Sequence, residues 1–365
     1  MDKFPTLKNP PKPDFEGLLA NLRRQGTPKR MYHMELFHDD PIADAICERF
    51  DIGRDADRSN IESMWRRDIA MRRFLGFDYI SAGAIQTDWT IKRLNIADTA
   101  EGNMAHAGGR NYMEEHAGPI TSWEEFEKYP FPNPNRPECT RALEWFSKHL
   151  PDDMCIVSHT GHFCELLCWL MGYETLCIAL HEQRDLVEAL ATKILEFHRA
   201  EVKVLLQFPR VRALWGSDDM GYRSGLMFSP ADMRKWVLSG HAELAKAAHD
   251  TGRLYFLHSC GNLRDITDDL IRDVKVDAKH SFEDTIEDCR DAKRTWGRQM
   301  SMIGGLDVDF LCRAGEDAIR ARTRDVLDKC MPNGGYALGS GNTVANYVPV
   351  DHYLAMVDEG RRWPG

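Results

Sequence analysis

The residue types best suited to chemistry in this chain are a histidine and a cysteine in the stretch LYFLHSCG, residues 254–261. An apolar run ends in His258, Ser259 and Cys260, which is the pattern of a buried strand that opens into a polar loop. Because side chains alternate along a strand, His258 and Cys260 point the same way. An imidazole nitrogen and a thiolate are half of a tetrahedral zinc site. The alternative is a core histidine beside a buried free cysteine, since H-x-C is a short pattern.

Other ionisable or polar side chains also follow predicted strands: Glu35 and His38, His159 and His162, Asp218 and Asp219, His280 and Glu283, Asp307, and Ser340 with Asn342. Polar residues are common where strands end, so each has an ordinary structural explanation. Asp218 and Asp219 are either a solvated loop cap or a base, ligand or substrate acceptor. His280 and Glu283 either pair with each other or move protons.

The elements that must position these residues alternate along the chain. Apolar runs typical of strands lie near residues 31, 79, 155, 212, 254, 277, 300 and 336, and helical segments separate them. Eight strands in βα alternation predict an α/β fold, a single (β/α)8 TIM barrel with its active site at the carboxyl ends of the strands. The competing layout is a doubly wound open sheet, but no G-x-G-x-x-G fingerprint follows an early strand.

The predicted barrel has two additions. Residues 1–30 form an N-terminal arm with a helix, and residues 31–365 form the catalytic domain. Within that domain, residues 82–152 do not show simple βα alternation and are interpreted as an insertion after the second strand.

Composition narrows the class of protein. The chain has 365 residues and a formal charge of −10, without a basic cluster, so nucleic acid and anionic membrane surfaces are not expected partners. It has no long apolar run and no leader-like start, which predicts a cytoplasmic protein. Its ten irregularly spaced cysteines are expected to be mostly reduced and buried.

Several stretches together resemble the uroporphyrinogen decarboxylase superfamily, and its cobalamin-dependent methyltransferase branch more closely than the true decarboxylases. They are GPITSWEEFEKYPFP (118–132), GSDDMGYRSGLMFSPADMRKWV (216–237), LYFLHSCGNLRDITDDLI (254–271), AKHSFED (278–284), MIGGLDVDFL (302–311) and GGYALGSGNTVANYVPVDHYLAMVDEG (334–360). The resemblance implies a single barrel of the kind that the strand count predicts.

The resemblance also implies a zinc site in which an H-x-C pair and a later cysteine bind the metal. His258 and Cys260 match the pair, whereas Ser340 stands where the later cysteine is expected, so an acid or a histidine would have to complete the set. The true decarboxylases use N-terminal arginines, an aspartate after the second strand and a histidine near the last strand. The corresponding stretches MYHMELFHDD and SAGAI, and Ser340, do not supply them.

The predicted function is therefore that of a corrinoid-dependent methyltransferase. It would move a methyl group between a small methylated or methoxylated substrate, or a thiol, and a separate corrinoid-binding protein, because the D-x-H-x-x-G motif of corrinoid binding is absent. Zn²⁺ on His258 and Cys260 would activate the leaving heteroatom or hold a thiolate. The residues assigned to proton transfer or substrate positioning are Asp218, Asp219, His280 and Glu283, and those assigned to substrate binding are Glu35, His159, Ser340 and Asn342.

Two alternatives stay open. One is a metal-free lyase of the same family that acts on a smaller carboxylated substrate with Asp218 or Asp219 as its acid or base. The other is a non-catalytic carrier of a tetrapyrrole or corrinoid.

Overall fold

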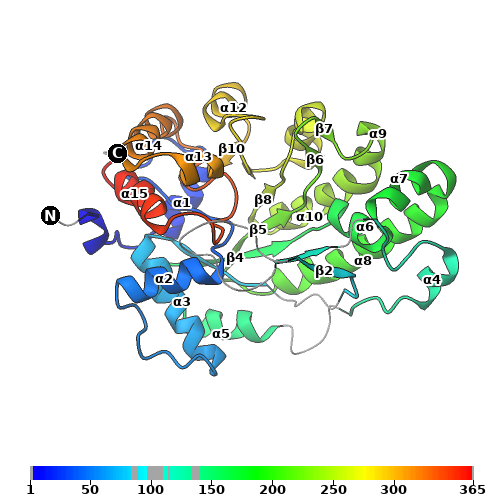
Figure 1. Ribbon diagram of the computed structural model, residues 1–365, viewed down its shortest axis with the longest axis horizontal. Coiled ribbons are helices and arrows are strands. Elements are labelled where there is room, and N and C mark those ends of the chain that lie inside the picture. The colour runs from blue at the N-terminus through cyan, green and yellow to red at the C-terminus, as the bar shows by residue number, and fades with distance from the viewer. Residues whose placement is uncertain (1–2, 84–88, 97–109, 114–115, 134–139, 364–365) are drawn as a thin grey trace.

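A curled, parallel, seven-stranded sheet forms the centre of the protein (Figure 1). The computed structural model describes residues 3–83, 89–96, 110–113, 116–133 and 140–363. In spatial order the sheet contains β1 (Tyr79–Ser81), β4 (Cys155–Thr160), β5 (Val211–Ser217), β8 (Leu254–His258), β9 (Ala278–His280), β10 (Ser301–Ile303) and β11 (Tyr336–Ala337). All neighbouring strands pair in parallel. This arrangement confirms the α/β class and is compatible with a barrel-like fold.

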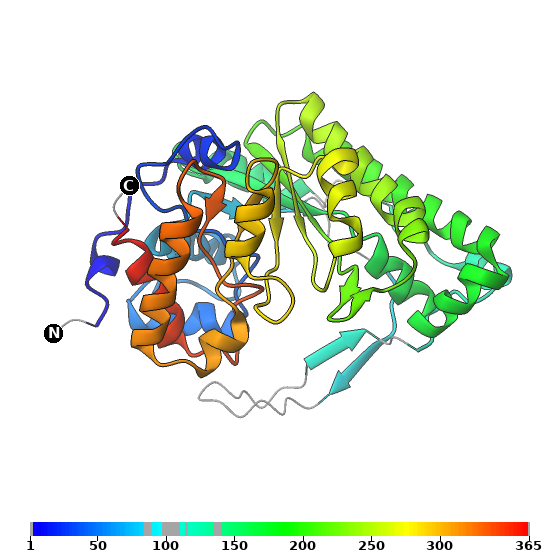
Figure 2. The same cartoon turned by 90° about the horizontal axis from the view of Figure 1, so that it is seen from above.

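Helices cover the outside of the sheet (Figure 2). They are α1 (Phe15–Leu22), α2 (Asp40–Arg49), α3 (Ile61–Leu75), α4 (Trp123–Lys128), α5 (Arg141–His149), α6 (Cys164–Met171), α7 (Tyr173–Glu182), α8 (Arg184–Leu205), α9 (Pro230–Met233), α10 (Ser239–Asp250), α11 (Thr267–Asp269), α12 (Cys289–Trp296), α13 (Val308–Arg313), α14 (Glu316–Cys330) and α15 (Val350–Gly360). Short 3-10 or π segments span Pro5–Lys8, Arg234–Leu238, Arg264–Ile266 and Leu270–Val274.

The strands form where the sequence places continuous apolar runs. All five residues of β8 are buried, as expected for a parallel strand that is covered on both faces. Helix boundaries follow capping chemistry: α3 begins after Asn60, whose side chain accepts from two backbone N–H groups, and ends at Gly76 in the left-handed conformation. Among the described residues, no helix has both the length and the apolar character needed to cross a bilayer.

The predicted first strand, Met31–Phe37, is not part of the sheet. Within it, the described backbone makes one isolated parallel bridge, at His33 with Leu338, and a second bridge joins the following residue, His38, to Val344. The physical reason lies at Glu35, whose N–H donates to the Tyr79 hydroxyl at 3.1 Å while that hydroxyl donates back to the Glu35 carbonyl at 2.7 Å. A side chain therefore occupies the hydrogen bonds that a neighbouring strand would need, and the described sheet has seven of the eight predicted strands.

The predicted insertion, residues 82–152, contains regular structure where it is described. An antiparallel pair joins β2 (Arg93–Ile96) and β3 (Arg110–Met113), which Figure 2 shows projecting from the body, and α4 and α5 follow. Parts of the predicted insertion lie outside the described residues. A second hairpin, β6 (Gly221–Tyr222) with β7 (Gly225–Leu226), follows β5.

The N-terminal segment is joined to the amino ends of the strands. Asn21 in α1 donates to the carbonyl of Tyr336 at 2.7 Å, and Ser301 donates to the carbonyl of Leu22 at 2.7 Å. These bonds place α1 at the edge of the sheet opposite to the carboxyl ends of the strands. The division into an arm (1–30) and a catalytic domain (31–365) stays a prediction.

Candidate functional site

The register of β5 and β8 brings the predicted acids to the predicted metal ligands. Ser217 lies opposite His258, so the residues that follow each strand leave the sheet together. The Asp218 N–H donates to the His258 carbonyl at 3.0 Å, which continues the ladder by one step. Gly261 then turns the second loop with φ +87°, and a Cβ at this position would lie 2.0 Å from the carbonyl oxygen of Gly221. Glycine therefore allows the two loops to touch.

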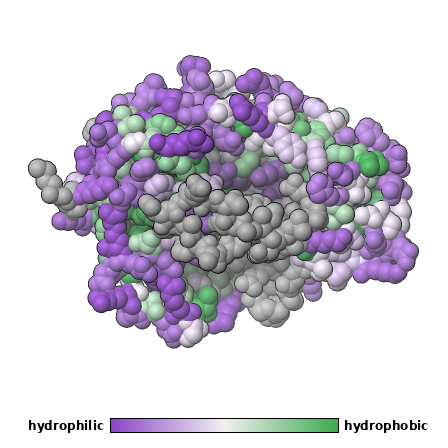
Figure 3. All heavy atoms as spheres, in the orientation of Figure 1, coloured by the Kyte–Doolittle hydropathy of each residue, from purple (hydrophilic) through white to green (hydrophobic). Residues whose placement is uncertain are grey.

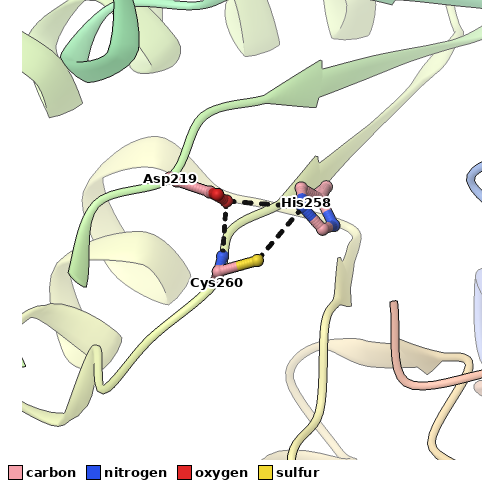
Figure 4. A group of neighbouring side chains, drawn as sticks. All are labelled: Asp219, His258 and Cys260. Atoms are coloured by element: carbon pink, nitrogen blue, oxygen red, sulfur yellow. Dashed lines mark hydrogen bonds and ion pairs between the residues drawn. The ribbon is translucent and has the colours of Figure 1, made fainter. Parts of the chain in front are cut away.

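Asp219, His258 and Cys260 form a compact group at this edge (Figure 4). His258 Nε2 lies 3.5 Å from Cys260 Sγ and 3.4 Å from Asp219 Oδ1. The Cys260 N–H donates to the same carboxylate at 2.9 Å, which holds Asp219 in place. One donor atom from each of the three residues lies within 4.8 Å of the others. The predicted pair is thus brought together, and an acid joins it.

The electrostatics of this group suit a cation. Burial raises the pKa of the Asp219 carboxyl, but its hydrogen bonds with His258 and Cys260 outweigh that effect and lower the pKa to about 2. Burial and the adjacent Asp219 charge raise the pKa of the Cys260 thiol. A fixed negative charge beside a nitrogen and a sulfur is a donor set that matches zinc, whose charge would stabilise the thiolate. The residues present therefore fit the metal.

The sulfur of Cys260 has two further polar neighbours. Asn342 Nδ2 donates to Sγ at 3.2 Å, and the Ser281 hydroxyl lies 3.7 Å from it. The sequence indicated Asn342 as a substrate-binding residue, whereas its contact with the sulfur was missed. An amide donor at this distance also stabilises a thiolate.

His280 lies behind His258 and is fully buried. Its Nδ1 is 2.8 Å from His258 Nδ1, because β8 and β9 place the two residues opposite each other. The sequence left open whether His280 pairs with Glu283 or takes part in proton transfer, and in the structure its Nδ1 contacts the other histidine. Nothing in the spacing of 22 residues between His258 and His280 indicated this contact.

Asp218 faces away from the group of three donors. Its carboxylate accepts from the backbone N–H groups of Phe163, Cys164 and Glu165 at 2.8–3.0 Å, and it lies 3.0 Å from His241 Nε2. These contacts satisfy the first turn of α6, where unpaired N–H groups favour a negative charge. The role of Asp218 in proton transfer stays a prediction, and its position supports an anchoring role.

The first testable prediction concerns this anchor. Replacing Asp218 with asparagine removes a buried charge and points an N–H₂ group at backbone donors, so we expect the free energy of unfolding to fall by about 3 kcal/mol. Chemical denaturation measures this loss, and Asp219→Asn is the matched control with an expected loss of about 1 kcal/mol. Equal stability of the Asp218 variant and the unmodified chain would contradict the anchoring role.

Two predicted substrate-binding residues, Glu35 and Ser340, bind each other. The Ser340 hydroxyl donates to Glu35 Oε2 at 2.6 Å and its N–H donates to Oε1 at 2.9 Å; both residues are fully buried. His33 Nε2 lies 3.3 Å from the same carboxylate. These bonds join the segment after residue 31 to the segment after β11, so their geometry supports a structural role.

His159, the remaining predicted substrate-binding residue, stacks on Trp215 with ring centroids 5.4 Å apart. Burial and the positive charge of neighbouring groups lower the pKa of its imidazole to about 3. His159 is therefore neutral at physiological pH and suits an apolar or hydrogen-bonding contact.

Glu283 lies in a cavity at the same end of the sheet. The cavity has a volume of about 990 Å³ and is lined by acids that include Glu283, Asp307 and Asp309, by the apolar residues Phe282 and Phe310, and by Asn342. Burial and the charges of Asp307 and Asp219 raise the pKa of the Glu283 carboxyl. Asn342, which lines this cavity, also donates to Cys260 Sγ, so the cavity adjoins the group of three donors. Figure 3 shows hydrophilic residues along most of the rim of the visible face.

Comparisons with known proteins agree with this architecture. The family model described as "Uroporphyrinogen decarboxylase (URO-D)" matches residues 111–363. Among solved structures, a methyltransferase from Methanosarcina mazei has a similar fold, with a TM-score of 0.68 and 15% sequence identity over 94% of this chain and 97% of the other. A search of curated protein sequences finds no match.

Proposed function

Because this chain belongs to the uroporphyrinogen decarboxylase family, we propose that it is a zinc-assisted methyltransferase of a corrinoid-dependent system. It moves a methyl group between a small methylated or methoxylated compound, or a thiol, and the cobalt of a separate corrinoid protein. The likeness in fold to a methyltransferase supports the class of enzyme.

One observation carries the proposal: the carboxylate of Asp219, the imidazole of His258 and the sulfur of Cys260 converge at the carboxyl ends of adjacent strands. In folds of this kind, that edge of the sheet is where active sites lie. In this proposal Asp219 supplies the third ligand, which removes the need for a cysteine at position 340. Three protein ligands leave one position of a tetrahedral zinc ion open for a substrate atom.

The chain's own residues supply the rest of the site. When bound, zinc would polarise the heteroatom that carries the methyl group or hold an acceptor thiol as thiolate. Asn342 orients the Cys260 sulfur through its amide, and Glu283 faces the adjoining cavity with a pKa raised by burial, which suits proton transfer to a leaving group. In this proposal, the neutral imidazole ring of His159 contacts the substrate.

The acidic lining of the cavity favours a methyltransferase over a decarboxylase of the same family. A decarboxylase acting on a carboxylated substrate needs cations to hold that substrate. Among the described residues that line the cavity, the acids Glu283, Asp284, Asp307 and Asp309 outnumber the cations, of which Arg313 is one. This charge favours a neutral or positively charged methyl donor, and the corrinoid is expected to arrive on its partner protein.

The experiment that tests the function is a methyl-transfer assay with zinc-loaded protein. Cob(I)alamin stands in for the corrinoid protein, and methanol, methylamines, methoxylated aromatics and methyl thiols are offered as donors. We expect the absorbance of cob(I)alamin to convert to that of methylcobalamin with at least one donor, and the Cys260→Ala variant to abolish the conversion. Metal-free activity on a carboxylated substrate, insensitive to chelators, would support the lyase instead.

A second prediction tests whether position 340 contributes to the metal site. The Ser340 hydroxyl is bound to Glu35 and to the carbonyl of Asn342, each at 2.6 Å. We therefore expect Ser340→Cys to leave the zinc affinity unchanged and to lower the free energy of unfolding by about 1–3 kcal/mol, since a thiol is a weaker donor. Zinc competition titration and chemical denaturation measure the two effects. A marked gain in affinity would show that a fourth ligand can enter from this position.

A further inference from the structure

His258 presents its two ring nitrogens to different neighbours. Nε2 faces the metal group, 3.5 Å from Cys260 Sγ and 3.4 Å from Asp219 Oδ1. Nδ1 lies 2.8 Å from Nδ1 of His280. Both rings are buried, so neither Nδ1 exchanges this contact for water.

The short contact between the two rings restricts where protons can lie. Two imidazole nitrogens 2.8 Å apart form a hydrogen bond that holds one proton. A neutral histidine that binds a metal through Nε2 carries its proton on Nδ1. His280 must then accept at Nδ1 and carry its own proton on Nε2.

The surroundings of His280 favour that arrangement. Burial favours a neutral ring, which has one proton to place. Among the described residues, no hydrogen-bond partner is found for its Nε2. A Cβ on Gly304 would lie 2.2 Å from the Ser340 oxygen and 3.1 Å from His280 Nε2. Gly304, with φ +84°, thus leaves room beside the Ser340 carbonyl for a hydrogen on Nε2.

Trp215 holds the His280 ring from another side. The two rings meet edge to face, with centroids 5.4 Å apart and an angle of 88° between their planes. Because Trp215 is itself fully buried in β5, His280 has little freedom to turn.

We propose that His280 is a positioning residue that accepts the Nδ1 proton of His258 and thereby keeps His258 Nε2 free to bind the metal ion. This role rests on the proposed zinc site. With the opposite arrangement of protons, His258 would carry its hydrogen on Nε2, pointing at Asp219 and Cys260, and would be a donor instead of a ligand.

Two substitutions at His280 test the proposal. The side chains of leucine and asparagine have the same branched arrangement of four heavy atoms, but only asparagine offers an acceptor oxygen near the position of Nδ1. The proteins are stripped with a chelator and titrated with Zn²⁺ against a competing dye. We expect His280→Leu to bind zinc about 10–100-fold more weakly than the unmodified chain, and His280→Asn to recover most of that loss.

Two further measurements separate positioning from folding. Co²⁺-loaded protein reports ligand geometry through its absorption spectrum, which we expect His280→Leu to change and His280→Asn to preserve. Long-range ¹H–¹⁵N spectra of the zinc-loaded unmodified chain locate the proton, which we expect on Nδ1 of His258, and this measurement needs no variant to fold.

The outcomes distinguish this proposal from the proposed function. If the unmodified chain binds zinc and His280→Leu binds it equally well, or if leucine and asparagine weaken binding equally, the role of His280 is overturned and the zinc site stands. A proton found on Nδ1 of His280 in the zinc-loaded protein would also overturn it. If the unmodified chain binds no zinc, the metal site fails and this role fails with it.

Discussion

Replacing His258 with alanine, or Cys260 with serine, is expected to reduce bound zinc from about one ion per chain to almost none. Each residue supplies one of only three protein donors in the described group. Zinc sites with four ligands bind with about 10–16 kcal/mol, which corresponds to roughly 3 kcal/mol for each ligand. Losing one ligand therefore weakens binding by about a hundredfold.

Metal analysis of protein purified without a chelator measures this effect, and competition titration gives the affinity. Cys177→Ser is a suitable control, because Cys177 is also partly exposed and lies in α7, away from the group of three donors. The control should keep its zinc. Full zinc content in both the His258 and the Cys260 variants would exclude the proposed site while leaving the fold unaffected.

The sequence predicted the sheet well because buried parallel strands need continuous apolar runs. The LYFLH run of β8 and the ALWG core of β5 carry this signal without help from distant contacts. The segment at Met31–Phe37 has a similar composition, yet its backbone bonds to the hydroxyl of Tyr79, 44 residues from Glu35. Composition does not report such a contact, so this predicted first strand is absent from the described seven-stranded sheet.

The candidate metal ligands also include residues that the sequence could assign and residues that it could not. His258 and Cys260 could be paired because alternation along a strand is a local property. Asp218 and Asp219 could not be told apart, since adjacent residues point in opposite directions and the sequence does not say which one meets α6. That choice depends on the N–H groups of residues 163–165, more than fifty positions away.

Position 340 shows that the spacing of a motif does not by itself identify a metal ligand. A serine there suggested an incomplete ligand set, whereas its hydroxyl is bound to Glu35, 305 residues away. The acid beside the pair comes instead from the loop after β5, through the register of β5 and β8. Register is set by packing of the whole sheet, and a single sequence does not reveal it.

The affinity for zinc is expected to rise with pH by about tenfold for each unit between pH 6 and 8, or about a hundredfold in total. The thiol of Cys260 must lose its proton to bind zinc, and burial together with the Asp219 charge raises its pKa, so the free protein holds that proton throughout this range. Asp219, with a pKa of about 2, is already ionised and adds nothing to the slope. Competition titrations at three pH values measure the slope, and calorimetry in buffers of different ionisation enthalpy counts the proton released.

The variant Cys260→Asp tests how much the sulfur contributes to the pH dependence of the zinc affinity. A carboxylate in place of the thiol is ionised well below pH 6, so its zinc affinity should lack the part of the slope that comes from the thiol proton. Since His258 and Asp219 are present in both proteins, any difference between the two slopes belongs to residue 260 alone. Equal slopes would mean that the sulfur does not bind the ion. The ligands would then be Asp219, His258 and a group other than Cys260.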